Sequence, residues 1–144
     1  MTTAFNYQQA FSRNIGWFTV EEQQKLQQSR IAIAGCGGVG GAHLLSLARL
    51  GIGQFSLADF DSFGIENFNR QVGANMSSIG RPKLAVMLEQ LLSINPDADI
   101  RAFDIGINEH NLAEFMQGVD LYIDSLDFFA ISIRRKVFAY CAEH

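Results

Sequence analysis

The chain contains little cysteine and little proline. Its two cysteines, Cys36 and Cys141, have no neighbouring Cys or His at the spacing of metal ligands, so the sequence predicts neither a disulfide framework nor a zinc site. Only two prolines interrupt the 144 residues, and no internal repeat or low-complexity tract is present. We therefore expect one domain over residues 1–144, in which strands and helices alternate without a linker.

Basic charge and long apolar runs are also scarce. Fifteen acidic and eleven basic side chains give a formal net charge of −4, which creates no broad positive field for nucleic acid or anionic lipid. No stretch approaches the roughly 20 apolar residues that a membrane-spanning helix needs, and the polar N-terminus lacks the features of a secretory signal. We expect a cytoplasmic protein that has neither nucleic acid nor a membrane as a partner.

Hydrophobic residues, in contrast, make up 48% of the chain, which is enough to build a folded core. Short apolar runs predict strands, and apolar residues at helical spacing predict helices. The expected strands cover residues 31–34, 54–58, 99–103 and 119–123. The expected helices cover about 39–50, 82–94, 111–117 and the segment from 129 onward, preceded by helices at 7–11 and 20–28 in an N-terminal extension of residues 1–28.

Strands that alternate with helices imply right-handed crossovers and a parallel sheet. We expect an α/β fold with a Rossmann-like parallel sheet, helices on both of its faces and short helices before it. Ligands of such sheets bind beyond the carboxyl ends of the strands. Gly35, Asp59 and Asp127 each follow an expected strand, so they are candidates for one shared site.

A glycine-rich segment, residues 35–41, lies between the first strand and the first helix of the sheet. Glycine lets the backbone approach a phosphate closely, and the start of a helix supplies free N–H groups and a positive dipole end. Asp59, at the end of the second strand, can accept hydrogen bonds from ribose hydroxyls. This pattern predicts a nucleotide site but does not choose between NAD and ATP, and a tight structural turn is the alternative. The candidate contacts are Gly35, Gly37, Gly38 and Gly40.

Two polar segments after the second strand favour ATP. The first contains Asn67, Asn69 and Arg70, and the second places Lys83 at a helix start. The glycine loop and helix dipole suffice for a pyrophosphate diester, whereas a triphosphate carries extra charge that Arg and Lys neutralise. The sequence therefore predicts ATP as the nucleotide.

These motifs, taken together, resemble the ubiquitin-activating-enzyme-like adenylyltransferases that include ThiF, MoeB and HesA. The resemblance covers nearly the whole chain, and six motifs stand in the family's order. They are residues 35–41, 59–61, 67–71, 79–83, 94–96 and 120–127.

The resemblance implies a reaction and a role for each matching residue. ATP and a carboxylate, usually the C-terminus of a ubiquitin-like carrier protein or a peptide, would form an acyl adenylate and pyrophosphate. Asp59 would hold the ribose, while Asn67, Arg70 and Lys83 would neutralise the phosphates and Asp127 would position Mg²⁺. The remaining candidates for contact with ATP are Asp61, Asn69 and Leu126, of which Asp61 could instead serve only to solvate its loop or cap a helix.

The N-terminal extension also carries a family feature. Arg13 resembles an arginine that reaches the triphosphate of a neighbouring subunit, which would make catalysis depend on a homodimer; the alternative is a surface arginine that caps a helix. Family chains continue beyond position 144, so the resemblance implies a truncated domain. Two other functions stay open at this point: an NAD(P)-binding oxidoreductase or sensor, and a non-catalytic scaffold that only dimerises.

Overall fold

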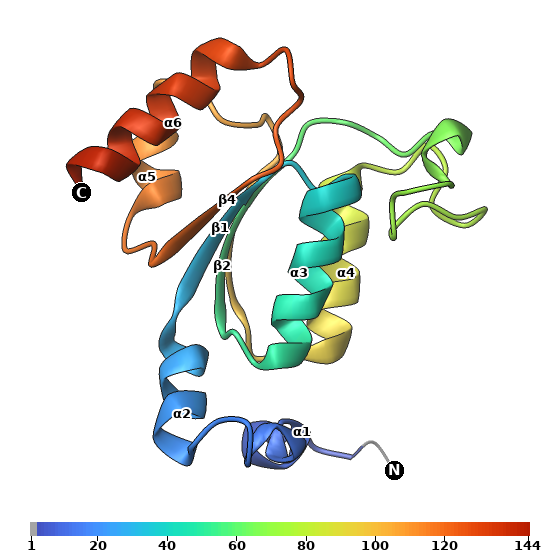
Figure 1. Cartoon of the computed structure of the whole chain (residues 1–144). Coiled ribbons are helices and arrows are strands. Elements are labelled where there is room, and N and C mark those ends of the chain that lie inside the picture. Colours follow the sequence, from blue (N-terminus) through green and yellow to red (C-terminus); the bar gives the residue numbers. More distant parts are fainter. Residues whose placement is uncertain (1–2) are drawn as a thin grey trace.

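The computed structural model describes residues 3–144, and a parallel sheet of four strands runs through its centre (Figure 1). The strand order is β3-β2-β1-β4, so the chain starts in the middle of the sheet and adds strands on both sides. The strands are in register at their carboxyl ends, where Ala34 pairs with Ala58 and with Asp124. The strands are β1 (Arg30–Ala34), β2 (Gln54–Ala58), β3 (Asp99–Phe103) and β4 (Leu121–Asp124).

Helices cover both faces of this sheet (Figure 1). The first pair, α3 (Gly38–Leu50) and α4 (Lys83–Ile94), packs on one face. The second pair, α5 (Leu112–Met116) and α6 (Ile131–Glu143), packs on the other. The predicted α/β class with helices on both faces is confirmed.

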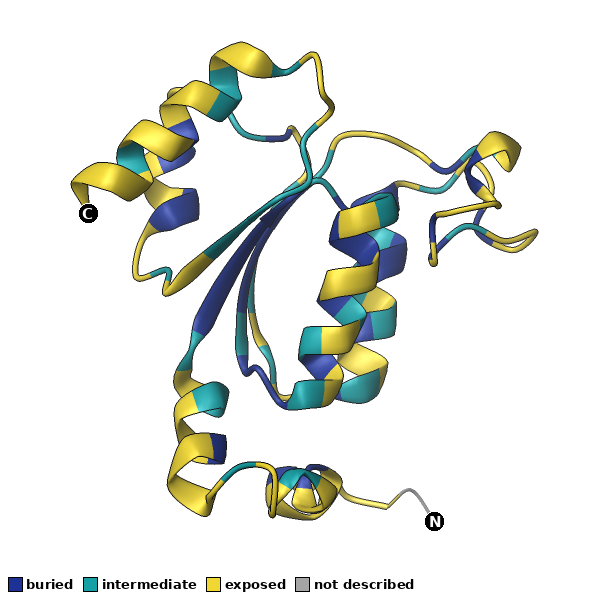
Figure 2. Cartoon of the chain, in the orientation of Figure 1, coloured by how far each residue is buried: buried dark blue, intermediate teal, exposed yellow. Residues whose placement is uncertain are grey.

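Burial follows from this layering (Figure 2). Every residue of β1 is buried because neighbouring strands flank it and helices cover both of its faces. One apolar cluster contains Leu44, Phe55 and Met87, and the other contains Phe115 and Val137. No helix within residues 3–144 has both the length and the apolar character needed to cross a membrane.

The N-terminal helices lie at the amino end of the sheet. They are α1 (Tyr7–Ala10), the 3₁₀ turn η1 (Ser12–Asn14) and α2 (Val20–Gln28). The Asn14 amide and the Gln23 amide each donate to the carbonyl of Leu50 at 3.0 Å, and the Tyr7 hydroxyl donates to the carbonyl of Gly51. These bonds satisfy the free carbonyls at the end of α3. They hold the extension at the opposite end from the edge where ligands of such sheets bind.

Two elements begin two residues later than the sequence predicts, while the other boundaries agree to within one residue. The fourth strand begins at Leu121 instead of 119, because the N–H of Asp120 bonds to the carbonyl of Arg30 and only then does regular pairing start. The last helix begins at Ile131 instead of 129, because the Asp127 side chain accepts the N–H of Phe129 and holds that segment in a turn.

Candidate functional site

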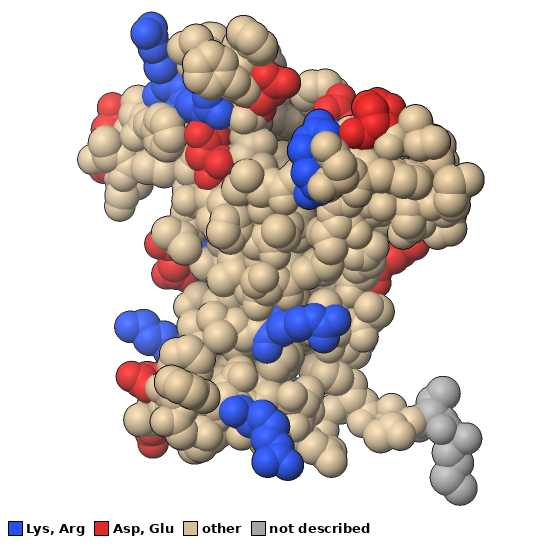
Figure 3. Space-filling view, turned by 45° about the vertical axis from the view of Figure 1, so that its right-hand side comes forward, with Lys and Arg blue, Asp and Glu red and all other residues tan. Residues whose placement is uncertain are grey.

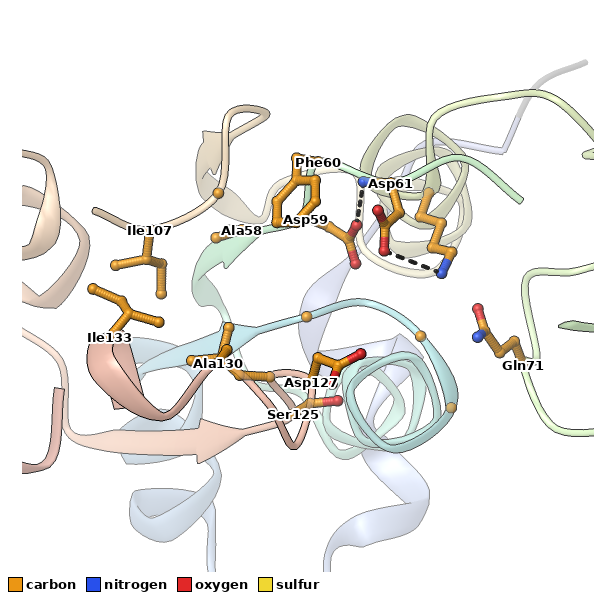
Figure 4. A pocket seen from close by; sticks show the side chains of 16 residues that line it. Ala58, Asp59, Phe60, Asp61, Gln71, Ile107, Ser125, Asp127, Ala130 and Ile133 are labelled. Atoms are coloured by element: carbon orange, nitrogen blue, oxygen red, sulfur yellow. Dashed lines mark hydrogen bonds and ion pairs between the residues drawn. The ribbon is translucent and has the colours of Figure 1, made fainter. Parts of the chain in front are cut away.

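A cavity of about 260 Å³ opens at the carboxyl edge of the sheet, where the residues after β1, β2 and β4 meet (Figure 4). The glycine loop forms its floor, and the segments after β2 and β4 form its sides. Of the residues predicted for the site, eight line this cavity. They are Gly35, Gly37, Gly38, Asp59, Asp61, Lys83, Leu126 and Asp127.

The glycine loop is packed too closely for side chains at two positions. Gly35 has a φ of +92°, and a Cβ there would lie 2.3 Å from the carbonyl oxygen of Ser125. A Cβ on Gly40 would lie 1.7 Å from the carbonyl oxygen of Gly35. Helix α3 starts at Gly38, which lines the cavity, and the N–H of Gly40 donates to the Ser125 hydroxyl. The N–H groups of Gly38 and Val39, in the first turn of α3, lack intrahelical partners and are available to an anion.

The Asp59 carboxylate organises this loop. Its Oδ2 accepts the N–H of Cys36 at 2.7 Å, and its Oδ1 accepts the N–H of Asp61 at 2.8 Å. One side chain thus joins the turn after β1 to the turn after β2. Each carboxylate oxygen has further lone pairs, so Asp59 can also accept hydrogen bonds from hydroxyls in the cavity.

Lys83 supplies the positive charge. Within residues 3–144, it is the one Lys or Arg whose side chain lines the cavity. It begins α4, is 8% exposed, and its Nζ lies 3.7 Å from Oδ2 of Asp61 and 5.9 Å from the centre of the Phe63 ring. A buried ammonium with a single exposed carboxylate partner can still bind an anionic ligand.

The predicted cluster of Asn67, Asn69 and Arg70 lies outside the cavity lining. The side-chain oxygen of Asn67 accepts the N–H of Gly64 at 2.9 Å and so stabilises the 3₁₀ turn η2 (Ile65–Asn67). Arg70 is exposed and donates to the carbonyl of Glu66 and to the side chain of Asn69, each at 3.0 Å. Its Cγ lies 3.7 Å from where a Cβ on Gly38 would be, so Arg70 borders the loop. Phosphate contact by these three residues stays a prediction.

The segment that carries Asp127 is held by Arg134, which lies on α6. Its Nε lies 2.7 Å from Oδ2 of Asp124, and its Nη2 donates to the carbonyl of Leu126 at 2.7 Å. Its Nη1 donates to the carbonyl of Phe128 at 3.4 Å. One guanidinium therefore fixes the carbonyls on both sides of Asp127, whose own Oδ1 accepts the N–H of Phe129 at 3.0 Å.

We expect Arg134→Ala to lower the free energy of unfolding by about 1–3 kcal/mol, because Asp124 loses its ion-pair partner and the two carbonyls lose their donor. The loosened segment should also weaken nucleotide binding. Arg135→Ala is the matched control, since Arg135 is exposed on the same helix. Urea denaturation and calorimetric titration with ATP check both variants, and equal behaviour of the two would contradict the role given to Arg134.

Eight lining residues of the cavity were not predicted from the sequence, among them two polar residues and an apolar wall. Gln71 directly follows the predicted polar cluster, and Ser125, whose Oγ accepts the N–H of Gly40 at 2.8 Å, follows β4. Their positions beside predicted residues were the available signal. The apolar wall formed by Ile107, Ala130 and Ile133 had no such signal, because these residues come from separate segments.

Cys36, inside the glycine loop, is not placed to act as a nucleophile. The residue is 1% exposed. Burial, together with the charge of the nearby Asp59 carboxylate, raises the pKa of the Cys36 thiol to about 12. The reactive thiolate is therefore scarce near neutral pH, and Cys36 serves as a small packing residue.

Two further predictions concern Arg13 and the metal. Arg13 is exposed in η1, at the amino end of the sheet, so it cannot reach the cavity of its own chain. Within residues 3–144, no group of three or more His, Cys, Asp or Glu side chains is arranged as a metal site. Asp127 alone still fits Mg²⁺, which commonly takes one or two carboxylates, phosphate oxygens and water.

A parallel sheet with a glycine loop, a helix start and a strand-end acid around one cavity is typical of Rossmann-like nucleotide-binding domains. The sequence profile of the ThiF family matches residues 11–144. The chain belongs to the ThiF family, which confirms the resemblance read from its motifs.

Relatives of known activity share this domain. The tRNA threonylcarbamoyladenosine dehydratase of Haemophilus influenzae is 34% identical over 94% of the chain and 52% of its own length. The molybdopterin-synthase adenylyltransferase of Salmonella typhimurium is 31% identical over 86% of the chain and 49% of its own length. The chain thus spans about half the length of these relatives.

Solved structures of similar proteins share the fold of this chain. The Escherichia coli tRNA N6-threonylcarbamoyladenosine dehydratase in complex with ATP superposes with a TM-score of 0.89 at 29% identity, over 99% of the chain and 58% of that protein. Escherichia coli MccB with ATP superposes with a TM-score of 0.80 at 28% identity, over 92% of the chain and 41% of that protein. Both of these relatives bind ATP.

Proposed function

We propose that this chain is the nucleotide-binding part of an ATP-dependent adenylyltransferase, which activates a carboxylate as an acyl adenylate and releases pyrophosphate. The observation that carries the proposal is the convergence of Asp59, Lys83 and Asp127 on one cavity above the start of α3. A triphosphate needs this combination of positive charge, free N–H groups and a carboxylate for Mg²⁺. The ATP complexes of the relatives support the choice of nucleotide.

We propose a place in the cavity for each part of ATP. Ile107 and Ile133 form an apolar wall at one end, which suits the adenine ring. Asp59 stands between this wall and the helix start, where it can accept bonds from the ribose. The phosphates would then lie over Gly37 and Lys83, which also line the cavity.

The chemical step joins two anions, because a carboxylate attacks the α-phosphate. The dipole of α3 and the Lys83 ammonium are fixed before the reaction, so they stabilise the developing charge without reorganising. Mg²⁺ bound at Asp127 would offset charge on the phosphates and on the departing pyrophosphate. The proposal thus needs no covalent intermediate on the protein and no reactive cysteine.

The acyl substrate is proposed to be the carboxylate of a ubiquitin-like carrier protein or a peptide. The relatives are named for several substrates, including a tRNA modification and molybdopterin synthase. Lys and Arg side chains are scattered over the face shown in Figure 3 and do not form a broad basic patch there. That distribution agrees with the proposal of a partner other than nucleic acid.

Pyrophosphate exchange into ATP tests both the reaction and the substrate. The protein is incubated with ATP, Mg²⁺ and labelled pyrophosphate, with a candidate carrier, a peptide or tRNA added in separate reactions. Exchange that depends on a carrier or peptide carboxylate supports the proposal. Exchange that occurs only with tRNA would show that tRNA, and not a carrier or peptide, is the substrate that is activated. Tight binding of NADH without ATP binding would favour an oxidoreductase or sensor, and ATP binding without exchange would favour a scaffold.

The homodimer and the role of Arg13 are part of the same proposal. Because Arg13 lies at the end of the chain's sheet away from its own cavity, it can serve only the cavity of a second subunit. We expect Arg13→Ala and Lys83→Ala each to abolish exchange, and mixed dimers of the two variants to regain part of it. The mixed dimer holds one cavity with both residues intact, so an inactive mixture would contradict action between subunits.

A further inference from the structure

Gln71 has a buried polar side chain that lines the cavity and has no part in the proposed reaction. Gln71 lies on the loop between η2 and α4, lines the cavity and is 7% exposed. Its N–H donates to the carbonyl of Asn67 at 2.9 Å, and its carbonyl accepts the N–H of Ala74 at 2.9 Å. The loop therefore fixes the point from which this side chain enters the cavity.

The amide of Gln71 is incompletely paired. Among residues 3–144, its buried Oε1 has no hydrogen-bond partner. Native proteins keep few such atoms, because a buried polar atom without a partner is costly. The amide also borders the glycine loop, since a Cβ on Gly37 would lie 3.3 Å from Nε2 and 3.4 Å from Oε1. A ligand over the glycine loop would be within reach of this amide.

The position of Gln71 in the cavity indicates which part of ATP its side chain would contact. Figure 4 shows Gln71 at one end of the cavity and the apolar wall of Ile107 and Ile133 at the other, with Asp59 and Asp61 between them. If adenine occupies the apolar wall, Gln71 faces the far end of the phosphate chain. The base and the ribose are held by other residues.

We propose that Gln71 binds the β- or γ-phosphate of ATP through its side-chain N–H, an inference that rests on the proposed function. A phosphate oxygen accepts and does not donate, so Nε2 must face it. A half-turn of the amide exchanges Oε1 and Nε2 without moving other atoms, and the bound phosphate selects the orientation. Gln71 thereby adds a donor without placing a second positive charge beside Lys83.

Calorimetric titration of the purified protein with ATP and with AMP, both with Mg²⁺, tests this contact. In Gln71→Met, which keeps the length but loses the donor, ATP should bind about threefold to tenfold more weakly. In Gln71→Glu, which sets a carboxylate against the phosphates, the loss should exceed tenfold, roughly. AMP affinity should stay unchanged in both, and Gln28→Met and Gln28→Glu, on the exposed surface of α2, are the matched controls.

Measuring ATP affinity as a function of pH provides a second test. A residue that only packs against the loop would not change the pH dependence of ATP binding. The ratio of the ATP dissociation constants of Gln71→Glu and wild type should fall from pH 8 to pH 5.5, as the introduced carboxylate takes up protons. The other charged groups that line the cavity, Asp59, Asp61, Lys83 and Asp127, are present in both proteins.

The possible outcomes test the contact between Gln71 and the phosphate separately from the proposed ATP-dependent function. Wild-type protein that binds no ATP would overturn the proposed function and, with it, this contact. Wild-type protein that binds ATP while Gln71→Met binds it equally well would overturn the contact alone. Equal losses for ATP and AMP would show that Gln71 only supports the loop, and would also overturn it; if Gln71→Glu does not fold, the Met variant decides.

Discussion

Lys83→Ala is expected to weaken ATP binding by about 1.5–3 kcal/mol, or roughly tenfold to a hundredfold, because a charged hydrogen bond to the triphosphate is lost. Folding should be nearly unaffected. Among residues 3–144, Lys83 pairs with the single carboxylate of Asp61, whose side chain is 58% exposed. Water can therefore solvate Asp61 after the ammonium is removed. Titration calorimetry and thermal unfolding of the same samples measure the two effects separately.

Lys25→Ala provides the control for charge. Lys25 is exposed on α2, away from the carboxyl edge of the sheet, so its removal changes the net charge equally without touching the cavity. If ATP affinity falls as far in Lys25→Ala as in Lys83→Ala, the loss reflects the change in net charge and not a contact between Lys83 and ATP. Unchanged affinity in Lys83→Ala would remove Lys83 from the site.

Gly40→Ala is expected to destabilise the protein by about 3 kcal/mol or more, since the added methyl has no space. The new Cβ would lie 1.7 Å from the carbonyl oxygen of Gly35 and 3.0 Å from the Cβ of Ser125. Either α3 or the turn after β1 must move, and the hydrogen bond from the N–H of Gly40 to Ser125 is lost. Urea denaturation should show the loss of stability, and ATP binding should fall below detection.

Gly38→Ala tests whether the effect belongs to the close contact or to glycine in general. A Cβ on Gly38 would meet the carbonyl oxygen and the Cγ of Arg70 at 3.6 and 3.7 Å, which are ordinary contact distances. The variant should retain nearly wild-type stability. Similar destabilisation of both variants would show that the loop does not depend on the close approach at Gly40.

The sequence predicted the elements of the fold well, because local signals and tertiary structure agree in this chain. The apolar run that became β1 is bounded by glycine, and the helical spacing from Leu84 to Leu91 matches the buried face of α4. The order of the strands depended on packing that no single segment encodes. The α/β class could therefore be predicted, whereas the order β3-β2-β1-β4 was observed.

The site was predicted where its residues directly follow a strand or start a helix. Asp59 and Lys83 are such residues, and both line the cavity. Gln71 could not be placed in the same way, because the path of its loop depends on bonds such as those from the Ser78 hydroxyl to the carbonyl of Gly73 and from Gly64 to Asn67. The sequence names the residues of such a loop but not which of them turn inward.

The role of Arg134 also could not be predicted from the sequence. Arg134 holds a loop while Arg135, the next residue on the same helix, is exposed, and periodicity alone cannot distinguish the two. The distinction arises because the segment after β4 returns over the start of α6 and brings the carbonyls of Leu126 and Phe128 to the guanidinium. That backbone path is set by tertiary contacts.

A crystal structure of the protein with a non-hydrolysable ATP analogue and Mg²⁺ tests the central claim most directly. We predict that the base lies against Ile107 and Ile133, that the phosphates lie over the start of α3 within hydrogen-bond distance of Lys83, and that the metal ion lies at Asp127. A nucleotide bound elsewhere, or one whose phosphates point away from both Lys83 and Asp127, would contradict it.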